Sequence, residues 1–191
     1  SYCLPSSSSG TGFLTFGGGS ETAKYTPLSS SSAVPSNFYG LDFTGIFVGG
    51  NKLSIPQSAF TTAGAIIDSG TVITRLPPAA YSALRTAFRQ GMSKYPTAPA
   101  LSILDTCYDL SSYTSGVSIP TLQVSFNGGI TVNIAANGIL YVNKPSQVCL
   151  AFAPNSDASD IAIFGNVQQK TLEVVYDVAN GRVGFASGGC S

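Results

Sequence analysis

The sequence predicts an all-β fold with a few short helices. Short runs of β-branched and aromatic residues recur along the chain, with glycine, proline, asparagine or serine between them. One segment, 77–90, has the spacing of apolar residues that is typical of an amphipathic helix. The chain has 191 residues, of which 43% are hydrophobic and 9% are charged, so we expect one domain-sized unit over residues 1–191 with a sizeable core.

The N-terminal part is expected to form strands joined by loops. Residues 12–16 predict one strand that ends in a run of three glycines, and residues 37–48 predict a longer strand that turns at 49–52. The serine runs at 6–9 and 29–32 are interpreted as polar loops between strands rather than as linkers. The glycine run does not predict a phosphate-binding loop, because no Lys-Ser/Thr follows it and it opens no helix.

The function prediction depends on one carboxylate and the residues around it. Residues 65–67 are apolar and rich in β-branched side chains, which favours a buried strand that ends at Asp68. Burial would disfavour the ionised carboxylate unless hydrogen-bond donors compensate. The hydroxyl groups of Ser69 and Thr71 and the backbone around Gly70 can supply them. On these residues alone, an ordinary Asx-type turn is the alternative.

Residues 77–90 predict the helix. A proline begins it, and Tyr81, Leu84 and Phe88 lie on one face, where we expect them to pack against the core. Gly91 is expected to end it.

The C-terminal half is expected to consist mainly of closely spaced strands. Two segments, 127–129 and 180–181, have the composition of hairpin turns. The expected strands are 121–126, 130–134, 139–142, 147–152 and 161–164.

The composition excludes several classes of function. The sequence has no histidine, which excludes Ser-His-Asp and Cys-His nucleophiles and imidazole metal sites and leaves carboxylate chemistry for hydrolysis. The loop 155–160 lacks the glycine and distal glutamate of a calcium loop, so we expect no metal and no cofactor. Nine basic residues balance nine acidic ones and are spread along the chain, so neither nucleic acid nor a membrane is expected as a partner.

The four cysteines, Cys3, Cys107, Cys149 and Cys190, do not have zinc-site spacing. Two disulfides are the favoured interpretation, which points to an oxidising compartment, and four buried free thiols are the alternative. Three disulfide pairings are compatible with the sequence.

The motif Ile66-Ile67-Asp68-Ser69-Gly70-Thr71 resembles the catalytic motif of the pepsin-like aspartic proteases, which occurs once in each of their two lobes. Ile163-Phe164-Gly165 resembles the segment that crosses behind the catalytic loop in that family, and the expected hairpin of strands 173–177 and 182–185 resembles its C-terminal ending. The resemblance implies a pepsin-like acid-protease lobe over nearly the whole chain.

Four further segments resemble the nepenthesin-type plant proteases, and most of all the group first described as chloroplast-nucleoid DNA-binding aspartic proteases. These segments are 1–5, 73–77, 104–110 and 165–169. The resemblance covers the C-terminal lobe of such a protease. It favours the disulfide Cys107–Cys149, and we infer Cys3–Cys190 because the first and last strands of such a lobe lie side by side.

The resemblance also implies a role for each site residue. Asp68 would be one half of a pair of carboxylates that holds the attacking water, Ser69 would lock the two catalytic loops together, Gly70 would present backbone to the substrate, and Thr71 would bond the outer carboxylate oxygen. Ile73 and Thr74 would line subsites. The support residues would be Ile163, Phe164 and Gly165.

The implied enzyme is an aspartic endopeptidase active at acidic pH, and its partners would be a polypeptide substrate and a second lobe. Asp68-Ser69-Gly70 is the one Asp-x-Gly loop in the chain, so we expect an N-terminal lobe that carries the other, as a separate non-covalent chain from a processed precursor. Homodimerisation is a further way to supply a second aspartate. A catalytically silent binding or inhibitor protein on the same fold and a DNA-binding regulatory protein are the alternative functions. The secretory pathway is the expected compartment, as an extracellular, cell-wall or vacuolar protein, with the chloroplast as the alternative.

Overall fold

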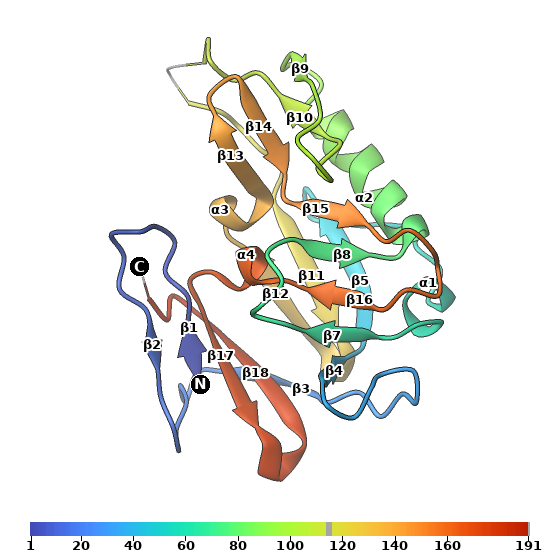
Figure 1. The fold of residues 1–191 in the computed structure, drawn as a ribbon, viewed down its shortest axis with the longest axis vertical. Coiled ribbons are helices and arrows are strands. Elements are labelled where there is room, and N and C mark those ends of the chain that lie inside the picture. The colour runs from blue at the N-terminus through green and yellow to red at the C-terminus, as the bar shows by residue number, and fades with distance from the viewer. Residues whose placement is uncertain (114–115, 191) are drawn as a thin grey trace.

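The structure, a computed structural model, describes residues 1–113 and 116–190 and consists mainly of β-strands with a few short helices, which confirms the predicted fold class (Figure 1). The strands are β1 (Tyr2–Cys3), β2 (Phe13–Leu14), β3 (Lys24–Pro27), β4 (Tyr39–Leu41), β5 (Phe43–Val48), β6 (Asn51–Lys52), β7 (Ala65–Ile67), β8 (Thr74–Leu76), β9 (Thr97–Ala98), β10 (Cys107–Tyr108), β11 (Leu122–Phe126), β12 (Ile130–Ile134), β13 (Leu140–Lys144), β14 (Gln147–Leu150), β15 (Phe152–Pro154), β16 (Ala162–Phe164), β17 (Leu172–Asp177) and β18 (Arg182–Ser187). The helices are α1 (Ser58–Thr61), α2 (Pro78–Gly91), α3 (Ala136–Ile139), α4 (Asn166–Gln169) and the 3₁₀ turns η1 (Asn127–Gly129) and η2 (Val178–Asn180). None of these helices combines the length and the apolar character that crossing a membrane requires.

The strands of the described ranges form four sheets, with the orders β2-β1-β17-β18-β3, β15-β8-β16-β7-β4, β12-β11-β5-β6 and β13-β14-β10-β9. The hairpin of β17 and β18 lies beside β1 and β2 on one side of the molecule, and α2 runs along the other side (Figure 1). The sheet that contains β7 is mixed: β16 is parallel to β7, and β15 is parallel to β8. These parallel pairs bring the segment that begins at residue 162 next to the predicted catalytic loop.

Two expected strands are divided, because the chain changes sheet within them. The strand expected over 37–48 is two strands that meet at Asp42: β4 pairs with β7, whereas β5 pairs with β11. The strand expected over 147–152 divides in the same way at Ala151, since β14 pairs with β10 and β15 pairs with β8. The strand expected over 12–16 is shortened to β2.

The predicted helix is present as α2, and Tyr81, Leu84 and Phe88 are buried as expected. The helix ends at Gly91 as predicted, and Gly91 is its last helical residue, without the left-handed backbone that often follows a helix end. A Cβ atom at Gly91 would lie 2.4 Å from Cγ of Pro120, so close packing is what this position requires.

An aromatic cluster connects three of the sheets, with Phe126 from β11, Phe164 from β16 and Phe185 from β18. Phe126 and Phe185 stack at 5.5 Å between ring centroids, and Phe164 stands edge-on to them at 5.6 and 6.0 Å. Phe126 and Phe164 are fully buried. Because offset and edge-to-face aromatic pairs have preferred geometries, the cluster orients as well as buries β16.

Two disulfides, Cys3–Cys190 and Cys107–Cys149, join the cysteines in the pairs expected above. The first bridge ties β1 to the segment after β18, and the second joins residues that are paired across β10 and β14.

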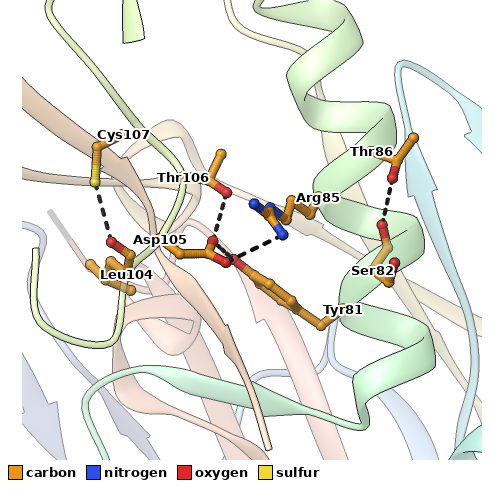
Figure 2. A network of polar contacts seen from close by, with 8 residues as sticks. All are labelled: Tyr81, Ser82, Arg85, Thr86, Leu104, Asp105, Thr106 and Cys107. Carbon is orange, nitrogen blue, oxygen red and sulfur yellow. Dashed lines mark hydrogen bonds and ion pairs between the residues drawn. The ribbon is translucent and has the colours of Figure 1, made fainter. Parts of the chain in front are cut away.

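A polar network fixes α2 to the segment before β10 (Figure 2). The hydroxyl groups of Tyr81 and Thr106 both donate to Asp105, and the guanidinium of Arg85 lies 3.6 Å from its other oxygen. Burial alone would raise the pKa of Asp105, but these hydrogen bonds and the positive charge outweigh it and lower the pKa. Burial and the same hydrogen bond raise the pKa of Tyr81, so it remains a donor.

We expect the replacement Asp105→Asn to remove a contribution to stability that depends on pH. Because the folded state lowers the pKa of Asp105, the contribution is present above the ordinary aspartate pKa of about 3.9 and is lost as the pH falls through the folded-state value. The cost at neutral pH should be on the order of 1 kcal/mol, since the carboxylate is more than a third exposed. Thermal unfolding followed by circular dichroism between pH 3 and 7 measures the difference in stability between wild type and Asp105→Asn. This difference should become smaller at low pH.

The matched control for this experiment is Thr86→Ala. Thr86 is on the same helix, but its hydroxyl bonds only to a backbone carbonyl of that helix. A difference from wild type that stays constant with pH in Asp105→Asn, as it should in the control, would contradict the role given to the carboxylate.

Candidate active site

Asp68 follows directly after β7, whose three residues are all buried. Its backbone N–H donates to the carbonyl of Phe164 at 3.1 Å, which extends the parallel pairing of β7 with β16 by one bond. Asp68 itself is partly exposed, and the next residues, Ser69 and Gly70, are exposed. The carboxylate therefore lies where a buried strand reaches the surface.

Both carboxylate oxygens of Asp68 accept a hydrogen bond from the loop that follows. Oδ1 accepts from the backbone N–H of Gly70 at 2.8 Å, and Oδ2 accepts from the hydroxyl of Thr71 at 2.6 Å. Two donors on two different oxygens fix the plane of the carboxylate, so the loop presents the group in one orientation.

The segment after β16 crosses directly behind this loop. A Cβ atom at Gly165 would lie 2.9 Å from the carbonyl oxygen of Thr71 and from backbone atoms of Ile73 and Thr74. Two backbones can approach this closely because glycine has no side chain. The Gly165 N–H also donates to the Thr74 hydroxyl at 2.9 Å.

The first turn of α4 holds the other side of the loop. The N–H groups of Asn166 and Val167 donate to the carbonyls of Thr71 and Val72 at 2.7 and 3.1 Å, and the Asn166 side-chain amide donates to the carbonyl of Ser69 at 3.1 Å. The loop 69–72 is thus bonded at three of its four carbonyls. The side chain of Ser69 remains exposed on the surface beside Asp68.

Ile73 and Thr74, both expected to line subsites, lie in different places. Ile73 lines a cavity, whereas Thr74 is 1% exposed and its hydroxyl donates to Oε1 of Gln168 at 2.6 Å. The expectation for Thr74 is therefore wrong in this structure. Its hydroxyl also accepts from Gly165, so Thr74 supports the loop from inside.

The cavity beside the loop has a volume of about 350 Å³ and mostly apolar walls. Its apolar lining residues are Val72, Ile73, Leu101, Ile103, Leu104 and Tyr141. The last four were not anticipated from the sequence, because they come from a loop and from β13, and no local pattern links these segments to the catalytic motif.

Two adjacent glutamines of α4 were also not anticipated. Gln168 and Gln169 are buried, with 1% and 0% of their surface exposed. The amide of Gln168 donates to the carbonyls of Gly138 and Ala151, and the amide of Gln169 donates to the carbonyl of Phe164. The sequence does place two adjacent polar residues close after Ile163-Phe164-Gly165, with Asn166 and Val167 between, but this signal does not indicate which contacts they make.

Within residues 1–113 and 116–190, no three histidine, cysteine, aspartate or glutamate side chains come together as they would to hold a metal ion. The chemical group that the site presents is the oriented carboxylate of Asp68.

We expect Gly165→Ala to destabilise the protein by roughly 2 kcal/mol and to displace the loop that holds Asp68. The atoms that the new methyl group would meet are backbone atoms, which cannot rotate away as a side chain could. Urea denaturation monitored by circular dichroism measures the loss. Gly18→Ala is the matched control, because a Cβ there meets no atom within 4 Å. Equal stability of the two variants would show that the backbone at Gly165 is not tightly packed against the backbone of residues 71–74.

Comparisons with known proteins show which family this chain resembles over most of its length. The Xylanase inhibitor C-terminal family matches residues 38–187. An aspartyl protease family protein of Arabidopsis thaliana is 62% identical over 193 residues, and the aspartic proteinase nepenthesin-2 of Nepenthes gracilis is 37% identical over 200 residues. Both alignments cover 100% of this chain but only 40% and 45% of those proteins, so the chain spans less than half the length of these relatives.

Solved structures show the same fold at low sequence identity. The crystal structure of edgp superposes with a TM-score of 0.78 at 19% identity and covers 97% of this chain and 53% of that one. Basic 7S globulin from soybean superposes with a TM-score of 0.68 at 20% identity and covers 87% of this chain and 42% of its own. This chain belongs to the Xylanase inhibitor C-terminal family and corresponds to the C-terminal lobe of a plant pepsin-like aspartic protease.

Proposed function

We propose that this chain supplies one of the two catalytic aspartates of an endopeptidase that cleaves peptide bonds at acidic pH. The observation that carries the proposal is the carboxylate of Asp68, oriented by the Gly70 N–H and the Thr71 hydroxyl at the end of a buried strand. The names of the relatives, which include aspartyl protease and nepenthesin, support the same reaction.

The proposed mechanism needs a second carboxylate close to Asp68. Two carboxylates that share a site cannot both ionise easily, so at acidic pH one is ionised and the other protonated. The ionised group takes a proton from a water molecule as the water attacks the peptide carbonyl, and the protonated group hydrogen-bonds the carbonyl oxygen. Gly70 is exposed beside the carboxylate, where its backbone can meet an extended substrate.

The substrate proposal is a polypeptide that places an apolar side chain beside the catalytic loop. The cavity at the end of the catalytic loop is lined by Val72, by Ile73 and by side chains of the loop 101–104. Val72 and Ile103 at its wall are 50% and 41% exposed, so an apolar side chain that covers them would bury apolar surface.

The proposed partner is an N-terminal lobe that carries its own Asp-Thr/Ser-Gly loop. The edge strand β2 supports a partner at this side of the chain, because its residues Phe13 and Leu14 and the nearby Phe16 are 38%, 66% and 90% exposed. An exposed apolar sheet edge is a surface that another chain segment can extend and cover. That the lobe belongs to a separate, non-covalent chain stays a prediction.

We expect native mass spectrometry of the isolated protein, followed by peptide mapping, to find a second polypeptide segment with the missing Asp-Thr/Ser-Gly. If denaturation releases it, the two lobes are separate chains. If it stays covalently joined, the two-chain prediction fails but the two-lobe proposal stands. Isolation of this chain alone, without any second segment, would contradict the two-lobe proposal.

The proposed compartment is oxidising, since both disulfides are formed. This favours the secretory pathway, with an extracellular, cell-wall or vacuolar destination, over the chloroplast that the sequence resemblance also suggests.

A binding protein without catalytic activity is the second candidate function. It is favoured by the description of the matched family, which names a xylanase inhibitor. In that case the fold would present its surface loops to another protein, and the intact hydrogen bonds around Asp68 would have no chemical use.

The replacement Asp68→Asn in the protein with both lobes distinguishes the two candidates. We expect acid proteolysis to fall by roughly 10²–10⁴-fold, because the asparagine cannot act as acid or base. The circular dichroism spectrum should be unchanged, since Oδ1 can still accept from Gly70. Cleavage of a denatured protein substrate across pH 2–6 is the measurement.

The control is Asp157→Asn, which changes an exposed carboxylate in a distant loop and should leave the rate as in wild type. A wild-type rate of proteolysis in Asp68→Asn would contradict the catalytic role proposed for Asp68. Absence of proteolysis in the wild-type assembly would favour the binding protein.

A further inference from the structure

Gln169 connects the catalytic loop to the first strand of the chain. Its side-chain amide donates to the carbonyl of Phe164 at 2.8 Å, and this same carbonyl accepts the backbone N–H of Asp68 at 3.1 Å. On its other end, the carbonyl oxygen of the Gln169 side chain accepts a hydrogen bond from the hydroxyl of Tyr2. One fully buried side chain therefore joins β1, β16 and the residue that carries the carboxylate.

The hydroxyl of Tyr2 lies close to the site. It is 3.5 Å from the hydroxyl of Tyr176, whose ring is tilted against the Tyr2 ring at 6.0 Å between centroids. Burial raises the pKa of Tyr2; hydrogen bonds with Tyr176 and Ser69 lower it, and the negative charge of Asp68 raises it again, with a net increase. Tyr2 therefore stays protonated, and its hydroxyl donates a hydrogen bond to the side-chain carbonyl of Gln169.

The backbone of Tyr2 is held from both sides. β1 pairs with β17, where Tyr2 lies opposite Val174, and with β2, where it lies opposite Leu14. The next residue, Cys3, is 1% exposed and is linked to Cys190. The backbone that carries the Tyr2 side chain is therefore held in place by strand pairing and by the neighbouring disulfide.

The position requires a side chain that is uncharged and carries both a donor and an acceptor, and a carboxamide meets this need at any pH. The side chain must donate to a carbonyl at one place and accept from a phenol at another, without a charge, in a fully buried site. A neutral amide does both. An aliphatic side chain would leave the phenol without its acceptor and the Phe164 carbonyl with one bond fewer, and buried polar groups without partners are costly.

We propose that Gln169 and Tyr2 are positioning residues that fix the backbone of Asp68 through the carbonyl of Phe164. The adjacent glutamine serves a different purpose, because Gln168 bonds to Thr74, Gly138 and Ala151. The consequence for catalysis rests on the proposed function, whereas the positioning itself is a property of the fold.

The first test measures the Asp68 amide directly, by hydrogen exchange with NMR detection in the protein that contains both lobes. Loss of the glutamine contact in Gln169→Leu should speed exchange of the Asp68 N–H by about tenfold, the factor expected from weakening one hydrogen bond. Tyr2→Phe keeps the ring but removes the hydroxyl, and should have a smaller effect in the same direction. The amide of Gly49, which donates to Thr121 far from the site, is the internal reference.

Tyr95→Phe is the matched control for Tyr2→Phe. Tyr95 is a buried tyrosine whose hydroxyl, like that of the partly buried Tyr2, has two hydrogen-bond partners, in this case the N–H and the carbonyl of Ser118. The variant Tyr95→Phe should lower overall stability without a specific effect on the exchange rate of the Asp68 N–H. Unchanged Asp68 exchange in Gln169→Leu, or equal acceleration at Asp68 and Gly49, would overturn the proposal.

Activity gives the second measurement. If the assembly is a protease, Gln169→Leu should lower kcat by roughly 10–100-fold with KM nearly unchanged, because misplacement of a catalytic group affects the chemical step. If wild type does not cleave at any acidic pH, the proposed function fails, and the exchange rates alone decide whether Gln169 positions Asp68. Undiminished kcat together with faster exchange would overturn the catalytic consequence.

The variant Gln169→Glu supplies a rescue that depends on pH. Burial raises the pKa of a carboxyl group above the ordinary glutamate value of about 4.3, so at acidic pH the protonated glutamic acid can donate to Phe164 and accept from Tyr2. The ratio of the Asp68 N–H exchange rate in Gln169→Glu to the rate in wild type should approach one at low pH and rise as the glutamate ionises. The same ratio in Gln169→Leu should not change with pH, and a pH-independent ratio in Gln169→Glu would contradict the proposed contacts.

Discussion

The parallel pairing of β7 with β16 is the constraint on which the site depends. Each strand has three residues, and their pairing ends with Phe164 opposite Ile67. One residue after each strand, the backbone leaves the sheet. Asp68 turns outward after β7, and Gly165 crosses behind it after β16. Because the Phe164 carbonyl accepts the Asp68 N–H, the position of the carboxylate is set by a segment from the far end of the sequence.

The local parts of this arrangement could be predicted from the sequence. An apolar β-branched run predicts the buried strand before Asp68, and the small and hydroxyl residues after it predict the donors that hold its carboxylate. The apolar spacing of α2 predicts its buried face. These signals work because strand burial, turn chemistry and helix periodicity are properties of neighbouring residues.

The remaining parts depend on which segments meet, and no local pattern records that. The chain changes sheet at Asp42 and at Ala151, and neither residue indicates which sheet the next strand joins. Thr74 has the same hydroxyl group whether it faces a substrate or a buried glutamine. Gln168 and Gln169 resemble surface residues by type, and only the surrounding carbonyls and hydroxyl groups make their complete burial tolerable.

Three hydrogen bonds within this chain orient Asp68. Gly70, Thr71 and the carbonyl of Phe164 fix the carboxylate and its backbone, and Gln169 fixes that carbonyl in turn. A catalytic group that is held before the substrate arrives needs no reorganisation during the reaction. A partner lobe would therefore add a second carboxylate and a cover for the apolar edge at β2, rather than reshape the first carboxylate. Under the proposed function, one lobe would therefore carry its half of the site fully oriented, and the chemistry would begin only when the second carboxylate is added.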